Sequence, residues 1–407
     1  RDSFPEVLVR WQALLARIES KKPFRRAPPE LFTVTRGGAL YALGTVMAHR
    51  DDAAALRCAE QLDDNGYALD HAYAAQVRAL YYGYHGMMVE YARCRERVDQ
   101  LAIQHGTSWQ TEVWAPGPES GVALLLHDAM GMKRAAERMK RLSESAPSLR
   151  VHARYMHGAY LLMRGRSGEA VAWLEDCLLE APCWRLAWGR AHGLLARAYN
   201  QQNLPEKARS TCMRVIEHFS AEQFDFPALN MNVMTELAIA EAQLGDVAAA
   251  RTRIAGLLQR LAVHHNPLTL GHLHETLLEI ALSARDATEA RTEFTRMKAQ
   301  YQAVATSSLM QRCDVLQAAL DELTGDARAH GEPSLAQAHT TTAELSSQLA
   351  LLVDPLLASK ERPFEERAAA VLRALSASVR ASHGVLALIA RDSSLNVIAT
   401  LDGRPVR

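Results

Sequence analysis

The feature that most constrains the fold of this chain is a pattern that recurs along most of its length. Each copy has two segments with apolar residues at helical spacing, joined by a short polar turn, as in "HGAYLLMRGRSGEAVAWLEDCLLEAP" over residues 157–182. Apolar residues three and four positions apart lie on one face of an α-helix, so each copy predicts two amphipathic helices. Such a pair cannot bury its apolar face alone, and neighbouring copies must therefore stack against one another.

One marker position in the second helix of each copy gives the spacing of the pattern. The marker is alanine in most copies, and a small side chain is expected where two helices cross because it lets them approach closely. The intervals between successive markers are 36, 45, 34, 38, 42 and 40 residues. The seven marker positions are Ala55, Tyr91, Ala136, Ala170, Ala208, Ala250 and Ala290.

This pattern resembles the tetratricopeptide repeat, a helical hairpin of about 34 residues. The copy at 157–182 fits the repeat motif best, through Gly158, Leu161, Gly165, Ala170, Leu174 and Pro182. The resemblance covers about residues 36–305 in about seven units. It implies an all-α fold in which about seven helical hairpins stack into an α-solenoid.

The glycine pair Gly165 and Gly168 raises the question of a phosphate-binding loop. Such a loop needs a preceding strand and the pattern GxxxxGK[ST], and no Gly-Lys dipeptide occurs in the sequence. We therefore interpret both glycines as a helix C-cap and turn between the two helices of a hairpin.

The whole sequence divides into five predicted regions. An N-terminal helix and connector occupy residues 1–35, and the repeats occupy 36–325. The segment 326–343 is small and polar and reads as a linker, followed by a connecting helix over 344–361. Residues 362–407 predict a helix and then a β-hairpin from the apolar runs 385–390 and 395–401.

The sequence from 362 to 407, with "HGVLALIARDSSLNVIAT" after a helix, resembles the beginning of a GAF-type sensor domain. The resemblance implies an incomplete α/β domain, since two strands alone leave edges exposed and cannot close a core. Because the chain also begins with Arg1 rather than Met, we expect it to be an internal piece of a larger protein.

Composition excludes several classes of function. Lys and Arg number 46, and so do Asp and Glu, so no excess of positive charge favours nucleic acid or an anionic membrane. No apolar run reaches the roughly 18 residues that a transmembrane helix needs. The six cysteines are scattered without CxxC pairs, which predicts reduced, mostly buried thiols in a cytoplasmic protein.

No motif in the sequence predicts catalysis, a metal site or a cofactor. GxSxG is absent, as is the DFG motif of protein kinases. His264, His265, His272 and His274 cluster in "HHNPLTLGHLHE", which lacks the second histidine of HExxH. We interpret them as loop or partly buried histidines, with a metal site as the alternative.

In the tetratricopeptide family the first helices of the hairpins line a concave groove. The resemblance therefore implies a groove that binds either a peptide or a neighbouring domain of the same polypeptide, and these alternatives stay open. The implied groove residues are Tyr73, Gln76, Tyr84, His152, Tyr155, Arg190, Arg197, Asn200, Asn232, His272 and Glu275.

The order of repeats followed by a GAF-like start resembles large bacterial signalling proteins that carry kinase and ATPase domains outside this region. It implies a non-catalytic interaction and regulatory segment. A freestanding scaffold or the arm of a transcription regulator is the alternative, and an enzyme would need a catalytic site that the sequence does not reveal.

Overall fold

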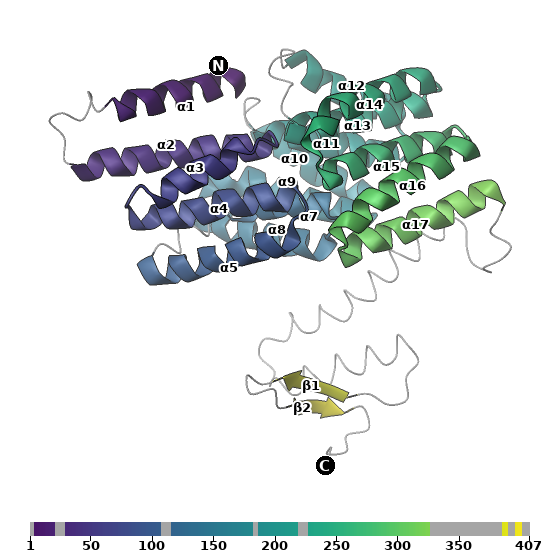
Figure 1. Cartoon of the computed structure of the whole chain (residues 1–407). Helices are drawn as coiled ribbons and strands as arrows, with labels where there is room; N and C mark the ends of the chain where they lie inside the picture. The colour runs from purple at the N-terminus through teal and green to yellow at the C-terminus, as the bar shows by residue number, and fades with distance from the viewer. Residues whose placement is uncertain are drawn as a thin grey trace. The chain divides into compact units, whose positions relative to one another are not determined.

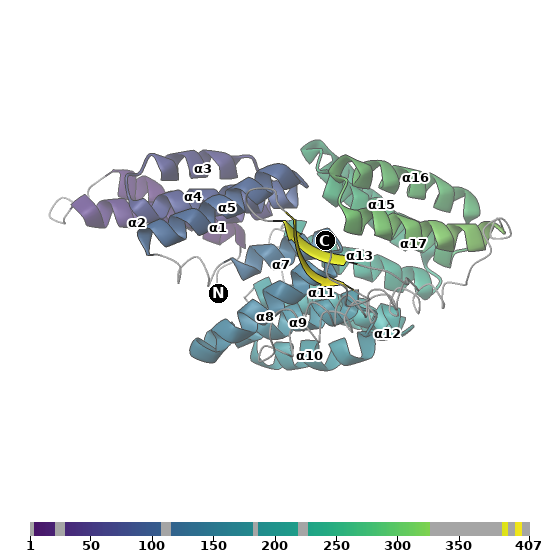
Figure 2. The ribbon, with the colours of Figure 1, turned by 90° about the horizontal axis from the view of Figure 1, so that it is seen from below.

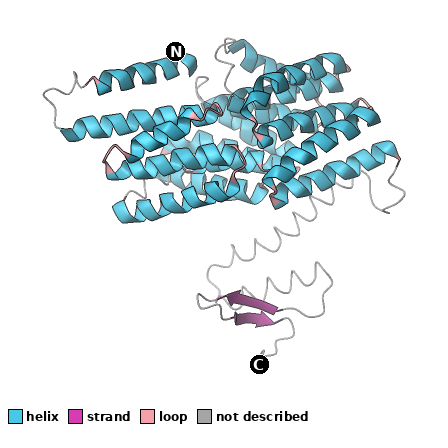
Figure 3. Cartoon of the chain, in the orientation of Figure 1, coloured by secondary structure: helices cyan, strands magenta, loops and turns pink. Residues whose placement is uncertain are grey.

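The computed structural model describes residues 4–20, 29–106, 115–181, 186–218, 227–325, 385–389 and 395–400. It divides into two compact units, residues 1–331 and 332–407, and the boundary falls within the predicted linker. The first unit is helical throughout its described residues (Figures 1 and 3). The all-α prediction for this part of the chain is therefore confirmed.

The helices follow one another with short connections. Their bounds are α1 Phe4–Glu19, α2 Pro29–His49, α3 Ala54–Asp63, α4 Ala68–Tyr84, α5 Met88–His105, α7 Pro116–Leu125, α8 Ala129–Ser145, α9 Arg150–Met163, α10 Ser167–Glu180, α11 Leu186–Gln201, α12 Pro205–His218, α13 Pro227–Gln243, α14 Val247–Leu261, α15 Pro267–Ser283, α16 Ala287–Val304 and α17 Ser307–Thr324. Two 3-10 turns, η2 Pro147–Leu149 and η3 Ala262–His264, precede α9 and α15.

The marker positions fall on α3, α5, α8, α10, α12, α14 and α16, which are the second members of seven successive helix pairs in the described residues. The six alanines are buried, with at most 4% of their surface exposed, whereas the larger Tyr91 is half-buried. In the best-matching pair, a Cβ on Gly158 would lie 2.7 Å from Leu174 Cγ. The helices therefore approach most closely where the sequence places its smallest residues.

The turns within the seven pairs share one backbone device. Each contains one residue with a positive φ, and the following N–H bonds to a carbonyl five residues earlier, as from Arg166 to Leu161 at 2.9 Å. This is the Schellman ending of a helix, and glycine is its usual left-handed residue. The seven positions are Asp51, Gly86, His127, Gly165, Asn203, Gly245 and Arg285.

One expectation needs correction at the residue level. Gly165 is the C-cap glycine, with φ at +70°, but Gly168 lies inside the first turn of α10 and not in the connecting turn. Helix α2 begins at Pro29, ahead of the predicted start of the repeats at residue 36, and a proline suits a first turn because it lacks only an N–H that has no partner there anyway.

The helix pairs of the first unit bring distant segments of the chain together. In Figure 2, α1–α5 and α15–α17 lie in the upper half of the view, and α7–α12 lie below them. Ser308 at the start of α17 donates a hydrogen bond of 2.6 Å to the carbonyl of Leu126 at the end of α7. The third helix pair thus meets the helix that follows the last pair.

Four of the six cysteines are buried, namely Cys58, Cys177, Cys212 and Cys313, and Cys94 is half-buried. These five are free thiols, while Cys183 lies outside the described residues. The predicted linker at 326–343, the connecting helix at 344–361 and the helix that opens the 362–407 segment also lie outside them.

In the second unit the described residues are two strands. β1 (Val385–Ile389) pairs antiparallel with β2 (Leu395–Thr400), with Val385 opposite Thr400 and an irregular step after Leu386. The two apolar runs in the sequence thus predicted the strands within one residue of their observed ends. Whether these strands open a GAF-like domain stays a prediction.

Candidate functional site

Two of the left-handed turns carry side chains that reach the far end of the helix array. Asp51 and His127 have φ values of +63° and +52°, a conformation that costs a residue with a Cβ about 1–2 kcal/mol relative to glycine. Both side chains contact residues at the start of α15 or along it, more than a hundred residues away in sequence. These contacts supply a reason for a side chain where other turns have glycine.

Asn266 joins the first turn to α15. Its Oδ1 accepts hydrogen bonds from the N–H groups of Leu268 and Thr269 at 3.1 and 3.2 Å, which caps the helix. Its Nδ2 donates to both Asp51 carboxylate oxygens at 3.1 Å and to the Tyr84 carbonyl at 3.0 Å. Asn266 is 2% exposed, so nearly all of its hydrogen-bonding capacity is satisfied by protein.

Asp51 has a second partner, His85, whose Nε2 lies 2.6 Å from the carboxylate. Burial lowers the pKa of His85, but the hydrogen bond and charge of Asp51 outweigh it, and the net pKa is raised. The negative charge of Asp51 is therefore shared between an imidazole and an amide.

The second turn-to-helix contact is a buried network around Glu275. Arg312 Nε donates to Glu275 Oε1 at 2.7 Å, and Tyr301 donates its hydroxyl hydrogen to Oε2 at 2.5 Å. His127 Nε2 lies 3.4 Å from the same carboxylate. Burial raises the pKa of Glu275, but Arg312 and then His127 outweigh it and hold the net pKa well below the ordinary value. Glu275 is accordingly an ionised acid inside the protein.

His127, His272 and Glu275 offer ligand atoms within 4.8 Å of one another, a spacing that a metal site would require. His272 uses Nε2 to donate a 2.8 Å hydrogen bond to the Leu125 carbonyl, and burial lowers its pKa to about 4. A guanidinium already neutralises Glu275 at 2.6 Å and would repel a cation. We therefore interpret this cluster as an ion-pair network that joins α7, α15 and α17.

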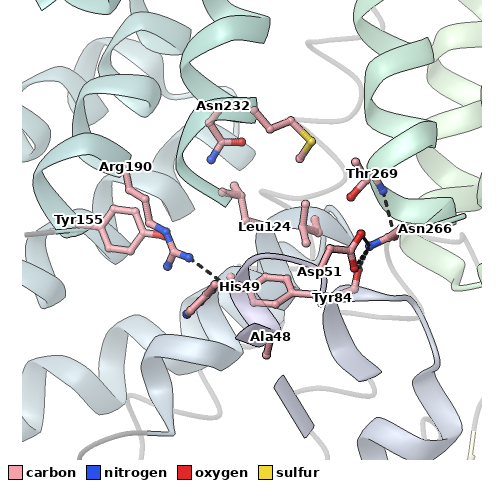
Figure 4. A pocket seen from close by; sticks show the side chains of 13 residues that line it. Ala48, His49, Asp51, Tyr84, Leu124, Tyr155, Arg190, Asn232, Asn266 and Thr269 are labelled. Carbon is pink, nitrogen blue, oxygen red and sulfur yellow. Dashed lines mark hydrogen bonds between the residues drawn. The ribbon is translucent and has the colours of Figure 1, made fainter. Parts of the chain in front are cut away.

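A small cavity lies beside these contacts, on the inner side of the first unit (Figure 4). Its volume, measured as the space open to the centre of a water molecule, is about 50 Å³. Residues from seven helices and one turn line it: Ala48, His49, Asp51, Tyr84, Gly121, Leu124, Leu125, Tyr155, Arg190, Met231, Asn232, Asn266 and Thr269. Gly121 has no Cβ, and the Tyr84 hydroxyl occupies the space that one would take.

The cavity holds a buried positive charge. Arg190 is 9% exposed and donates one hydrogen bond of 3.1 Å to the Tyr84 hydroxyl. Within the described ranges no carboxylate forms an ion pair with Arg190. Burial, followed by the charge of Arg190, lowers the pKa of the neighbouring His49 to about 3, so this imidazole is neutral near pH 7.

The predicted groove residues divide into three sets. Tyr84, Tyr155, Arg190 and Asn232 line the cavity, and His272 and Glu275 belong to the ion-pair network beside it. Of all eleven, the buried ones are Tyr84, Tyr155, Arg190, Asn200 and Glu275, and the half-buried ones are Tyr73, Gln76, His152, Arg197, Asn232 and His272.

The rest of the predicted set lies elsewhere on the inner helices. Asn200 donates to the Glu236 side chain at 2.9 Å, with Arg197 3.9 Å from the same carboxylate. Burial raises the pKa of Glu236 to about 7. Tyr73 stacks on Tyr41, with ring centroids 4.3 Å apart. These contacts are local and do not extend the cavity.

Sequence reasoning missed five polar residues of this region: His49, Asp51, His127, Asn266 and Thr269. A weak signal for two of them exists in the sequence, since Asp51 and His127 occupy turn positions where three of the seven copies have glycine, but Asn203 and Arg285 share that signal. Asn266 stands before a proline at the start of a helix, which is a capping pattern, but nothing local connects it with Asp51.

The four clustered histidines do not form a common site in the described residues. His264 and His265 are exposed, whereas His272 and His274 lie on α15. His274 Nδ1 lies 2.6 Å from Glu293 on α16, whereas His272 bonds to the carbonyl of Leu125 on α7.

The helices of the described ranges include none with both the length and the apolarity to cross a membrane. Comparison of the sequence with protein-family models and with curated proteins gives no match.

Proposed function

We propose that residues 36–325 form a solenoid of tetratricopeptide-like hairpins that acts as a non-catalytic interaction and regulatory segment of a bacterial signal-transduction protein. The observation that carries this proposal is the succession of seven helix pairs with the same left-handed turn. Each pair places a small or aromatic marker on its second helix, and such arrays offer extended surfaces rather than a single reaction centre.

Burial of the inner residues favours a neighbouring domain over a peptide as the partner. Tyr84, Tyr155 and Arg190 would have to contact a peptide lying along the inner face, yet the protein's own helices cover them. A partner that docks on outer faces and helix ends needs no such access. The proposed partners are therefore flanking domains of the same polypeptide.

The chain's thiols support a role without catalysis. Burial raises the pKa of Cys177 to about 12, and it raises the pKa of Cys58 and Cys313 as well. A thiol must ionise to act as a nucleophile, so these three are poor candidates for one. In this proposal the β1–β2 hairpin opens a GAF-like sensor domain that receives a signal.

The first test is the size of the native polypeptide, measured by blotting cell extract with an antibody to α9–α12. A species far larger than the 45.0 kDa of this chain supports an internal regulatory segment. A species near 45.0 kDa contradicts it and supports a freestanding scaffold.

Cross-linking of the native protein then tests the partner. Lys140, Lys207 and Lys298 lie on α8, α12 and α16, so they sample three widely spaced pairs. Cross-links from these lysines to sequence outside residues 1–407 of the same polypeptide support docking of flanking domains. Cross-links that stay within the chain in a larger polypeptide contradict it.

A further inference from the structure

The cavity beside α11 has the features of a binding site that the proposed scaffold function does not use. It has a buried cation, hydrogen-bonding groups with capacity left unused, and walls from distant helix pairs. Arg190 donates to the hydroxyl of Tyr84 and lies beside that of Tyr155, which leaves most of its five N–H groups for another acceptor. A buried guanidinium is ordinarily paired with an anion, because an unpaired buried charge is costly.

Two further groups of the cavity have hydrogen-bonding capacity to spare in the described part of the chain. The Tyr155 hydroxyl is buried, with its residue 2% exposed, and Arg190 is its neighbour for hydrogen bonding. The half-buried Asn232 lines the cavity, and none of the hydrogen bonds of the described residues involves its side-chain amide. Figure 4 shows Arg190, Tyr155 and Asn232 around the same space.

The charge of the lining favours an anion over a cation. His49 is neutral near pH 7, since its pKa is about 3, so it neither competes with Arg190 nor neutralises it. Asp51 is the acid of the lining, and its carboxylate is engaged by His85 at 2.6 Å and by Asn266 at 3.1 Å. Among the charged groups of the described lining, Arg190 is therefore the one that no oppositely charged side chain neutralises.

The size of the cavity limits the ligand. A volume of 50 Å³ open to the centre of a water molecule corresponds to about three to five waters. An anion of four or five non-hydrogen atoms fits this space, whereas a nucleotide or a peptide does not. Planar carboxylates and tetrahedral phosphate both match the donor fork of a guanidinium.

We propose that this cavity binds a small oxyanion, held by Arg190 and by the side chains of Tyr155 and Asn232. The three residues come from α9, α11 and α13, while the other walls of the cavity come from α2, α4, α7 and the start of α15. Binding to the folded state alone raises the melting temperature, and it does so in a saturable manner.

The experiment titrates the full chain with sodium acetate and, separately, with inorganic phosphate at constant ionic strength. Thermal unfolding and isothermal titration calorimetry give the shift in Tm and the Kd. We expect saturable binding of at least one of the two anions, and the pair of titrations tells a carboxylate from a phosphate. Absence of saturable binding by both anions overturns the proposal.

Arg190→Gln removes the charge while keeping an amide of similar reach, and the expected result is at least a tenfold weaker Kd. Arg209→Gln on the exposed face of α12 is the matched control and leaves the Kd unchanged. Asn232→Ala, which keeps the buried charge, tests the site if the first variant does not fold, and the expected weakening is about threefold. Unchanged binding in a folded Arg190→Gln or Asn232→Ala variant refutes the assignment.

Discussion

Asn266 gives the sharpest test of how the two ends of the first unit are held together. In Asn266→Ala the helix α15 loses its cap, which costs about 1 kcal/mol. The buried Asp51 carboxylate loses an amide donor, worth about 1.5–3 kcal/mol, and the Tyr84 carbonyl loses a neutral hydrogen bond worth about 1 kcal/mol. The residue is 2% exposed, so water cannot replace these bonds, and the total loss is about 4 kcal/mol.

The matched control is Asp246→Ala, which removes the cap of α14. The Asp246 carboxylate accepts from Ala249 N at 3.2 Å on an exposed turn, and its removal is expected to cost about 1 kcal/mol. The assay is urea unfolding followed by circular dichroism at 222 nm, with the m-value compared between variants to establish that the same surface unfolds.

A second variant separates the cap from the contact. Asn266→Asp keeps an acceptor for the N–H groups of Leu268 and Thr269 but places a carboxylate against Asp51. It should therefore lose at least as much stability as the alanine variant at pH 7 and regain part of it at pH 4. If Asn266→Ala costs no more than Asp246→Ala, the contact between the ends contributes nothing and the reasoning fails.

Three further predictions follow from contacts described above. Gly158→Val places its Cβ 2.7 Å from Leu174 Cγ and should destabilise the protein by about 1–3 kcal/mol. Gly168→Ala meets no neighbour and should stabilise the protein by up to about 1 kcal/mol. Equal effects of the two variants in thermal unfolding would contradict the packing argument. The raised pKa of His85 means that its ion pair contributes stability below pH of about 6.5 and loses it as the pH rises through the folded-state pKa. His85→Gln should therefore reduce the stability advantage seen at low pH in urea titrations, and an unchanged pH profile would count against it. Glu275→Gln removes one of the two carboxylates paired with Arg312, leaving Glu279 at 2.7 Å, and should cost about 1.5–3 kcal/mol in the same assay; unchanged stability would contradict the pairing.

The sequence predicted the helices of the first unit well because their apolar periodicity and turn residues are local. Ala170 and Gly165 illustrate this, since each marks a crossing or a turn through its own size or backbone freedom. Gly168 was predicted in the connecting turn but lies in the first turn of α10. A glycine is tolerated at this exposed helical position, and it has no role in the turn.

The site was less predictable because it depends on contacts between distant hairpins. Tyr84 and Arg190 were named from the repeat pattern as groove residues, and the pattern says nothing of the 106 residues that separate these two hydrogen-bonded side chains. The sequence analysis named no role for Asp51, because its role appears only once Asn266 is placed beside it. Helix periodicity fixes which residues face inward, but the rotation accumulated over several hairpins decides which of them meet.

The contacts between the two ends also have a mechanical consequence. An open array of helix pairs frays from its termini, because each terminal pair has a neighbour on one side alone. Here Leu126 and Asn266 tie early helices to late ones, so the array has fewer loose ends than its linear order suggests. Amide hydrogens of α4 and α15 should consequently exchange with solvent in one cooperative opening, at a rate closer to that of the middle helices than to that of a fraying end.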